Sequence, residues 1–160
     1  MVHDVMLRLF CFCMLIFAPT LVMGAQDPLQ NCFRLAALPV DPQNEFEGVP
    51  FGALDAPAII ANCSPFLPDD DDGKVHFHLG RGYFAKGDLE HALELFHLSA
   101  ERGYPASFFA LGVAHQLGDG VERNFDLAES YYLVASSLGV DAADDALQLL
   151  KRDRKEFSAN

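Results

Sequence analysis

The stretch "ALGVAHQLGDGVERNFDLAESYYLVASSLG", Ala110–Gly139, decides the fold because a shorter version of it lies just before it in the chain. Both copies contain a Leu-Gly pair, then an aromatic residue or histidine, an alanine, an aromatic residue and a closing glycine. The two sets are Leu79, Gly80, Tyr83, Ala92, Phe96 and Gly103, and Leu111, Gly112, His115, Ala128, Tyr132 and Gly139. Such a repeat predicts a solenoid, in which each unit buries its apolar face against its neighbours.

A third copy begins after the second and has no second helix. Three residues return after 36 positions: Ala106, Ala110 and Leu111 as Ala142, Ala146 and Leu147. Small residues in each copy are expected to let the two helices of a pair approach closely, while Phe96 and Tyr132 fill the groove between successive pairs. We therefore predict an all-α, antiparallel helix-pair solenoid over residues 73–157. Its units are 73–104, 105–140 and a partial 141–157.

The Gly-Asp-Gly-Val turn, Gly118–Val121, is a candidate phosphate or metal site. It lies in a four-residue extension, because Gly112 and Ala128 are 16 residues apart where their counterparts in the first copy are 12 apart. A phosphate loop would have more glycines, a lysine and a preceding strand. We interpret the turn as structural, and expect left-handed helix ends at four glycines, Gly87, Gly103, Gly118 and Gly139.

Both copies resemble known helical repeats. The pattern H-x-x-LG-x-x-Y from His76 to Tyr83 resembles a tetratricopeptide repeat, with histidine where that family usually has tryptophan. The second copy is similar to the Sel-like repeat of the same superfamily, which has an LG pair, a Gly-x-Gly-Val turn, an aspartate, an alanine, an aromatic pair and a closing glycine. Departures are His115 for the usual tyrosine, and Leu133 and Val134 where lysine is common. The resemblance covers Lys74 to about Lys151.

The resemblance implies a concave groove, lined by the first helix of each pair, that accepts a peptide or protein partner. Matching the LG registers places six residues on that side: Phe77, Arg81, Phe84, Phe109, Val113 and Gln116. An aromatic patch with one arginine suits partner binding. The alternative is that these side chains contact the N-terminal helices or the C-terminal segment.

The N-terminus predicts a secretory signal peptide over residues 1–25. The run "LFCFCMLIFAPTLVM", Leu9–Met23, has no charge, follows Arg8, and precedes small residues that suit cleavage after Gly24 or Ala25. The alternative is an uncleaved membrane anchor, since the 17 residues of Leu9–Ala25 reach the lower limit for crossing a bilayer.

The cysteines agree with export. Cys11 and Cys13 would leave with the signal, so the mature chain keeps Cys32 and Cys63. An even number in an exported chain predicts a disulfide, which would stabilise the fold by roughly 3–4 kcal/mol at this loop length. Two isolated cysteines with no histidine between them make a metal site the weaker interpretation.

Residues 26–72 hold seven of the nine prolines and form a separate N-terminal segment. We expect a short helix over Leu29–Leu38, a loop from Pro39 to Gly52, and a helix from Asp55 or Ala56 to Pro65, with Pro57 in its first turn. The disulfide would tie the two helices together across the loop.

The acidic run "PDDDDGK", Pro68–Lys74, invites a calcium interpretation. Counting back from Gly73, Pro68 and Leu79 occupy the first and twelfth positions of an EF-hand loop, and neither can bind Ca²⁺ through its side chain. We expect a solvated turn whose acids favour the N-terminus of the next helix.

A net charge of −12 argues against nucleic acid as a partner, because phosphate binding needs clustered lysine and arginine. The one basic cluster, "KRDRK" at Lys151–Lys155, ends a predicted helix and complements its dipole. No membrane contact is expected after signal cleavage, and no cofactor or metal.

The sequence does not predict an enzyme. Histidines such as His76, His78, His91 and His97 are the candidate bases, and no serine or cysteine is placed as their nucleophile. Some exported, cysteine-rich Sel-like proteins have been assigned penicillin binding or β-lactamase activity, but they carry a disulfide within each repeat, and both repeats here lack cysteine.

The function expected is therefore an exported adaptor or regulator that binds another protein through its concave face. The resemblance places it in a bacterial periplasm, while the signal alone would also fit secretion from a eukaryotic cell. The alternative is a cell-wall-related or β-lactamase-like hydrolase. A third possibility is self-association as part of a larger assembly, since two and a fraction repeats are near the minimum for a stable stack.

Overall fold

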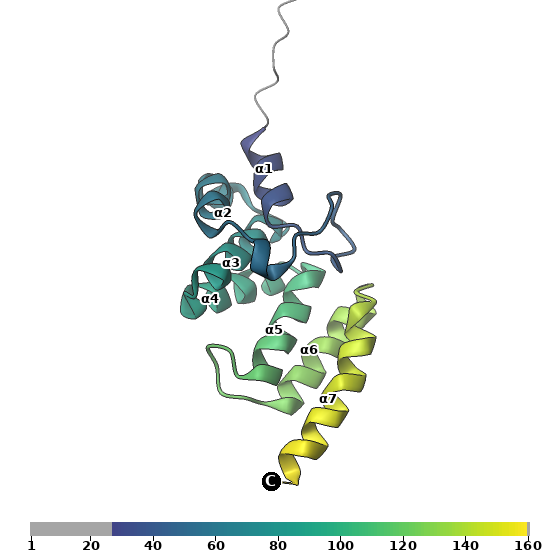
Figure 1. Cartoon of the computed structure of the whole chain (residues 1–160). Helices are drawn as coiled ribbons and strands as arrows, with labels where there is room; N and C mark the ends of the chain where they lie inside the picture. Colours follow the sequence, from purple (N-terminus) through teal and green to yellow (C-terminus); the bar gives the residue numbers. More distant parts are fainter. Residues whose placement is uncertain (1–26, 160) are drawn as a thin grey trace, which may run out of the picture.

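The computed structural model describes residues 27–159 as a stack of helices (Figure 1). No strand occurs between these residues, so the predicted all-α class is confirmed. The α-helices are α1 (Pro28–Leu35), α2 (Ala56–Cys63), α3 (Lys74–Lys86), α4 (Leu89–Glu101), α5 (Pro105–Leu117), α6 (Phe125–Ser137) and α7 (Ala142–Ser158). Two 3-10 helices, η1 (Phe51–Ala53) and η2 (Ser64–Asp69), flank α2. The predicted signal peptide, with Cys11 and Cys13, lies outside the described residues.

Helices α3 and α4 form one antiparallel pair, and α5 and α6 form the next. The expected close approach is present in both, because each pair places a glycine under an aromatic ring. A Cβ atom on Gly80 would lie 2.7 Å from Cε1 of Phe96, and one on Gly112 would lie 2.6 Å from the ring of Tyr132. Any larger residue would push the ring away, so glycine sets the spacing within each pair.

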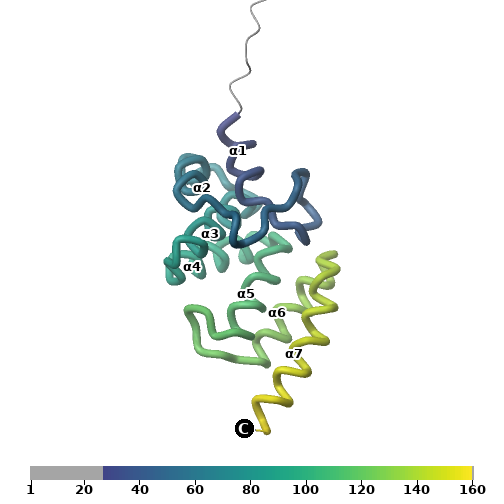
Figure 2. Tube along the Cα trace, in the orientation of Figure 1, coloured from purple at the N-terminus to yellow at the C-terminus, as the bar shows by residue number. Residues whose placement is uncertain are grey.

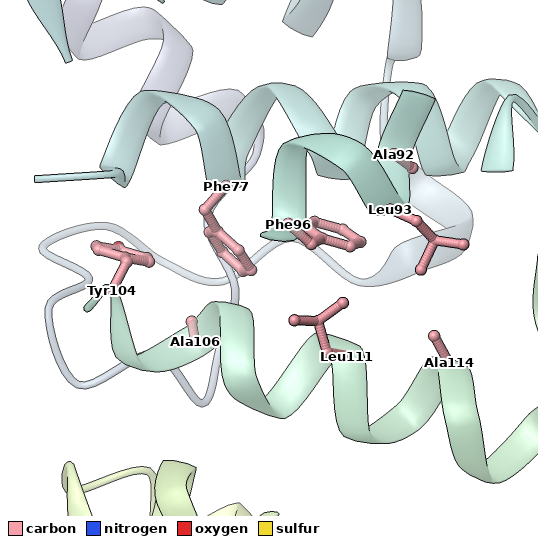
Figure 3. Close-up of a cluster of buried hydrophobic side chains, with 8 residues drawn as sticks. All are labelled: Phe77, Ala92, Leu93, Phe96, Tyr104, Ala106, Leu111 and Ala114. Carbon is pink, nitrogen blue, oxygen red and sulfur yellow. The ribbon is translucent and has the colours of Figure 1, made fainter. Parts of the chain in front are cut away.

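Successive pairs are joined by shared apolar clusters. Figure 3 shows Phe77 of α3 with Leu93 and Phe96 of α4, all pointing toward Leu111 and its neighbours on α5. A second cluster joins α6 to α7 in the same way, through Ala128, Tyr132, Ala135, Val140, Ala143, Ala146 and Leu150. Helix α7 therefore continues the stack as the first helix of a third unit.

Glycines end the helices as predicted. Backbone φ is positive at each of the four expected positions, Gly87, Gly103, Gly118 and Gly139. The extended turn after α5 contains a further positive-φ residue, Gly120, and a Cβ there would lie 2.7 Å from Cβ of Leu89 on α4. The turn therefore packs against the preceding pair, and Asn124 then caps α6 by accepting hydrogen bonds from Asp126 N and Leu127 N.

Helices α1 and α2 extend the stack by one pair at its N-terminal end. The side chain of Asp55 caps α2 by accepting a hydrogen bond from Ala58 N, and Pro57 lies in the first turn as expected. The first helix is shorter than predicted, ending at Leu35 rather than Leu38. The Cys32–Cys63 disulfide is present and joins the two helices. Both cysteines are fully buried, in a cluster that includes Ile59 of α2 and Leu79 of α3.

The segment between α1 and η1, residues 36–50, is here called the strap. Figure 2 shows it leaving α1 as an irregular loop and returning toward α2. It has no helix or strand, and Asn44 shapes it by donating hydrogen bonds to Leu38 O and Phe46 O. None of the helices between residues 27 and 159 combines the length and the apolar composition that a membrane span requires.

Candidate functional site

A groove with a volume of about 490 Å³ lies between the strap and the first helices of the two pairs. This is within the usual size range of ligand pockets, roughly 300–1,000 Å³. The lining residues are Leu38, Pro39, Val49, Pro50, Phe51, Phe77, Arg81, Phe84, Phe96, Phe109, Ala110, Val113, Ala114, Leu117 and Asp119. Apart from Arg81 and Asp119 they are all apolar, so the groove suits an apolar ligand.

Five of the six residues that the sequence placed on the concave face line this groove. The sixth, Gln116, instead joins three helices. Its Oε1 accepts a hydrogen bond from the Tyr132 hydroxyl at 2.7 Å, and its Nε2 donates to Asp153 of α7 at 2.6 Å. For Gln116 the alternative expectation, contact with the C-terminal segment, describes the structure.

Arg81 fastens the strap to α3. The guanidinium donates to Ala36 O at 2.5 Å and to Val49 O at 3.1 Å, which lie at the two ends of the strap. The residue is only 7% exposed. Burial lowers the pKa of Arg81 to about 10, opposed by the nearby Asp41 carboxylate, so the side chain stays charged at neutral pH.

Phe77 lies at the bottom of the groove and has no exposed surface. Its ring packs 5.7 Å from that of Phe96 and 5.3 Å from that of Tyr104, measured between centroids. Phe77 and Arg81 therefore contact the core and the N-terminal segment, the alternative stated from the sequence. Phe84, Phe109 and Val113 are half-buried and so keep part of their surface accessible.

Two large, exposed apolar residues at the groove were not singled out from the sequence. Phe51 and Leu117 are 55% and 51% exposed, unusually high for large apolar side chains. The Phe51 ring contacts that of Phe84 edge to face, with the centroids 5.4 Å apart. A phenylalanine beside Pro50 in a loop, and a leucine directly before the helix-ending Gly118, were the available signals.

A further hydrogen bond holds the strap against the start of α5. The Tyr104 hydroxyl donates to Asp41 Oδ2 at 2.5 Å, and both residues are buried. Burial, together with the hydrogen bond to Asp41, raises the pKa of Tyr104 far above its ordinary value. With Arg81 and Tyr104 both engaged, the strap is a fixed wall of the groove.

In the acidic run before α3, Asp70 is buried, whereas the sequence predicted that the whole run would be solvated. The sequence predicted a solvated turn, but Asp70 is 7% exposed and its carboxylate accepts hydrogen bonds from Val75 N and His76 N, at 3.1 Å and 2.9 Å. It also bonds to His76 Nδ1. Burial alone would raise the pKa of Asp70, but these hydrogen bonds, above all those from His76, hold it below its usual value. The run thus caps α3 from inside the fold.

His78 is also a structural residue. It is 1% exposed, and its Nδ1 lies 2.8 Å from Lys74 O, so that nitrogen carries the hydrogen. Burial lowers the pKa of His78 to about 3, which keeps the imidazole neutral. The ring packs against those of Phe33 and Phe77.

The remaining polar clusters carry no recognisable chemistry. His91 pairs with Asp88, and the rings of His97 and His115 both pack against Tyr131. Between residues 27 and 159 no histidine hydrogen-bonds to a serine or cysteine, and no three histidine, cysteine or acidic side chains gather as they would around a metal ion. What the described arrangement offers is an apolar binding surface.

Comparison with known proteins agrees with the helical pairs. Residues 73–104 and 107–140 each match the Sel1 repeat, a family that generally mediates protein–protein interaction. No curated protein and no solved structure matches the chain. The first match spans α3 and α4, and the second spans α5 and α6. Two segments of the chain are therefore similar to the Sel1 repeat, and each coincides with one helix pair.

Proposed function

We propose that this protein is an exported adaptor or regulator that binds another protein or peptide in the groove between the strap, α3 and α5. The observation that carries the proposal is the groove itself. It is apolar, of ligand-binding size, and built mainly from the first helices of two repeats that belong to an interaction family. Such a surface gains free energy when a partner removes it from water.

The distribution of exposure supports a partner at this place. Phe51 and Leu117 keep more than half of their surface exposed at the rim, above the half-buried Phe84, Phe109 and Val113. Aromatic side chains in a groove whose shape is already fixed are typical of residues that dominate binding energy. Because Arg81 and Tyr104 hold the strap, little ordering would be needed when a partner binds.

Export is part of the proposal. The uncharged run Leu9–Met23 has the form of a signal peptide, and the Cys32–Cys63 disulfide fits an oxidising compartment such as the periplasm or the extracellular space. We expect the mature chain to begin near residue 25.

The test is a cross-linked pull-down from the native compartment with the mature chain and two double variants. The groove variant is Phe51→Gln with Leu117→Gln. The control variant is Leu133→Gln with Leu149→Gln, which changes two apolar residues of 55% and 46% exposure that lie outside the groove. All four positions are exposed enough for both variants to fold, which circular dichroism would check.

We expect a partner that the wild type and the control variant recover and the groove variant loses. A partner recovered equally by all three chains would place binding elsewhere on the surface. No specific partner with any of them would contradict the adaptor proposal.

A further inference from the structure

The two charged residues of the groove lining differ in what surrounds them. Arg81 is the only cation among the lining residues, and both ends of its guanidinium donate to strap carbonyls, Ala36 O and Val49 O. It is also almost fully buried. A carboxylate or phosphate group entering the groove would therefore meet no exposed cation in its lining.

Asp119 is the only carboxylate among the lining residues, and it is available. It lies between the two positive-φ glycines of the turn after α5, and its backbone N–H donates to Ala114 O at 3.0 Å. Its side chain has no hydrogen bond or ion pair with any residue in the part of the chain that the structure describes. The carboxylate thus stands half-buried at the Leu117 end of an apolar groove, without a cation.

The net charge of the whole chain also favours a cationic partner over an anionic one. The chain carries a net charge of −12. On the strap, Glu45 and Glu47 are exposed close in sequence to the lining residue Val49. In the basic cluster of α7, Arg154 is engaged by Asp126 and Glu129 of α6, at 3.0 Å and 2.9 Å. The net negative charge of the chain favours the approach of a cationic partner.

We infer that the groove accepts an apolar segment of a partner protein that carries a lysine or arginine at one end, and that this cation pairs with Asp119. The inference rests on the proposed function and adds the chemistry of the partner. Apolar side chains of the segment fill the space between Phe51, Phe84 and Val113. The basic residue then supplies the ion pair that Asp119 lacks among the described residues, since Arg123 of the same turn donates to Leu117 O at 3.1 Å instead.

The experiment uses three short fluorescent peptides with the same leucine- and phenylalanine-rich centre, ending in lysine, glutamine or glutamate. Binding to the mature chain is measured by fluorescence anisotropy. The protein variants are Asp119→Asn, the groove variant Phe51→Gln with Leu117→Gln, and the control Leu133→Gln with Leu149→Gln. We expect the lysine peptide to bind roughly twofold to fivefold more tightly than the glutamine peptide, the size typical of an exposed ion pair. The difference should shrink as salt is added.

The variants separate this inference from the function on which it rests. Asp119→Asn should bring the lysine and glutamine peptides to equal affinity, while the groove variant should weaken all three and the control none. Equal binding of all three peptides to the wild type, lost in the groove variant, would overturn the charge preference and leave the adaptor function standing. Tighter binding of the glutamate peptide, or no binding of any peptide, would also overturn the inference. Dimerisation in sedimentation velocity that the groove variant loses would make a second copy the occupant and overturn it too.

Discussion

Helices α3 and α5 hold the same place in successive repeats, yet one is buried and the other forms an open wall. Both place a glycine against an aromatic ring of their partner helix, so the scaffold is the same. On α3, however, eight consecutive residues, Val75–Gly82, are buried. On α5 the buried positions are interrupted by Phe109 and Val113, which are half-buried in the groove. The difference comes from the disulfide-tied N-terminal segment, which packs on α3 and turns the concave face of the first repeat into core.

One register position makes the contrast plain. Arg81 and Val113 each follow the glycine of the Leu-Gly pair. Arg81 donates two hydrogen bonds to the strap, whereas Val113 lines the open groove. A repeat motif fixes where a side chain points, but the neighbouring segment determines whether that side chain builds the core or lines an open groove.

The largest effect is expected when the disulfide is removed from the N-terminal segment, because this segment makes the two repeats different. Cys32→Ser with Cys63→Ser should lower the free energy of unfolding by roughly 3–4 kcal/mol, because the unfolded chain regains the entropy of the closed loop. Urea denaturation measures this, and wild type reduced with dithiothreitol should give the same curve. A loss below about 1 kcal/mol would mean that the N-terminal pair is held mainly by packing.

The next prediction compares the same substitution at the position after each Leu-Gly pair, Arg81 on α3 and Val113 on α5. Arg81→Met removes the partner of Ala36 O and Val49 O, and a buried group left unpaired costs about 1–3 kcal/mol. The matched variant, Val113→Met, changes the same position on α5 and should cost less than about 1.5 kcal/mol. Equal losses in urea denaturation would show that the strap does not depend on Arg81.

A third prediction tests the scaffold that the repeats share. Gly80→Ala and Gly112→Ala should each cost about 1–3 kcal/mol, since the new methyl group would displace the ring of Phe96 or Tyr132. Gly52→Ala is the control, because a Cβ there meets no atom within 4 Å. Thermal unfolding compares the three, and a large difference between the first two variants would contradict a common helix spacing.

The effect that is smallest near neutral pH concerns acid stability and involves His78 of α3 and Asp70 before it. The pKa of His78 is about 3 in the fold. In the unfolded chain the imidazole of His78 takes up a proton near pH 6.5. Between about pH 3 and pH 6.5 the unfolded chain therefore binds more protons than the folded chain, and the free energy of unfolding falls as the pH falls. The expected slope is about 1.4 kcal/mol per pH unit. Below the ordinary pKa of Asp70 the lowered pKa of that carboxyl adds a loss of the same sign.

His78→Phe tests this slope, since it keeps an aromatic ring among Phe33 and Phe77 and removes the titrating group. Urea denaturation between pH 4 and pH 6.5 should then give a flatter profile. His91→Gln is the control, because the hydrogen bond with Asp88 raises the pKa of exposed His91 and its contribution disappears only as the pH rises above 6.5. An unchanged slope in His78→Phe would show that another group controls acid unfolding.

Much of the fold follows from local patterns in the sequence. The glycines at helix ends, the glycine beneath each ring and the Asp55 cap depend on residues close in sequence or on a repeated spacing, and all are present. The disulfide followed from counting the cysteines that remain after the predicted cleavage. Groove residues such as Phe84 and Val113 could be placed because the repeat fixes their register.

The rest depends on contacts between distant segments, which a periodic pattern does not encode. The strap has no periodicity, so its path over Arg81 and its bond with Tyr104 could not be read from residues 36–50. Asp70 looked like one of four solvated acids, yet the backbone of α3 draws it into the interior. Phe51 and Leu117 belong to the groove only because the strap and the end of α5 lie on its two sides.

The most direct test of this account is hydroxyl-radical footprinting of the mature chain, alone and with the captured partner, because it reports the exposure of individual side chains. The account predicts oxidation of Phe51 and Leu117 and none of Phe77 in the chain alone, with Phe51 and Leu117 protected in the complex. Oxidation of Phe77 at the rate of Phe51, or no protection of Phe51 and Leu117 by the partner, would contradict it.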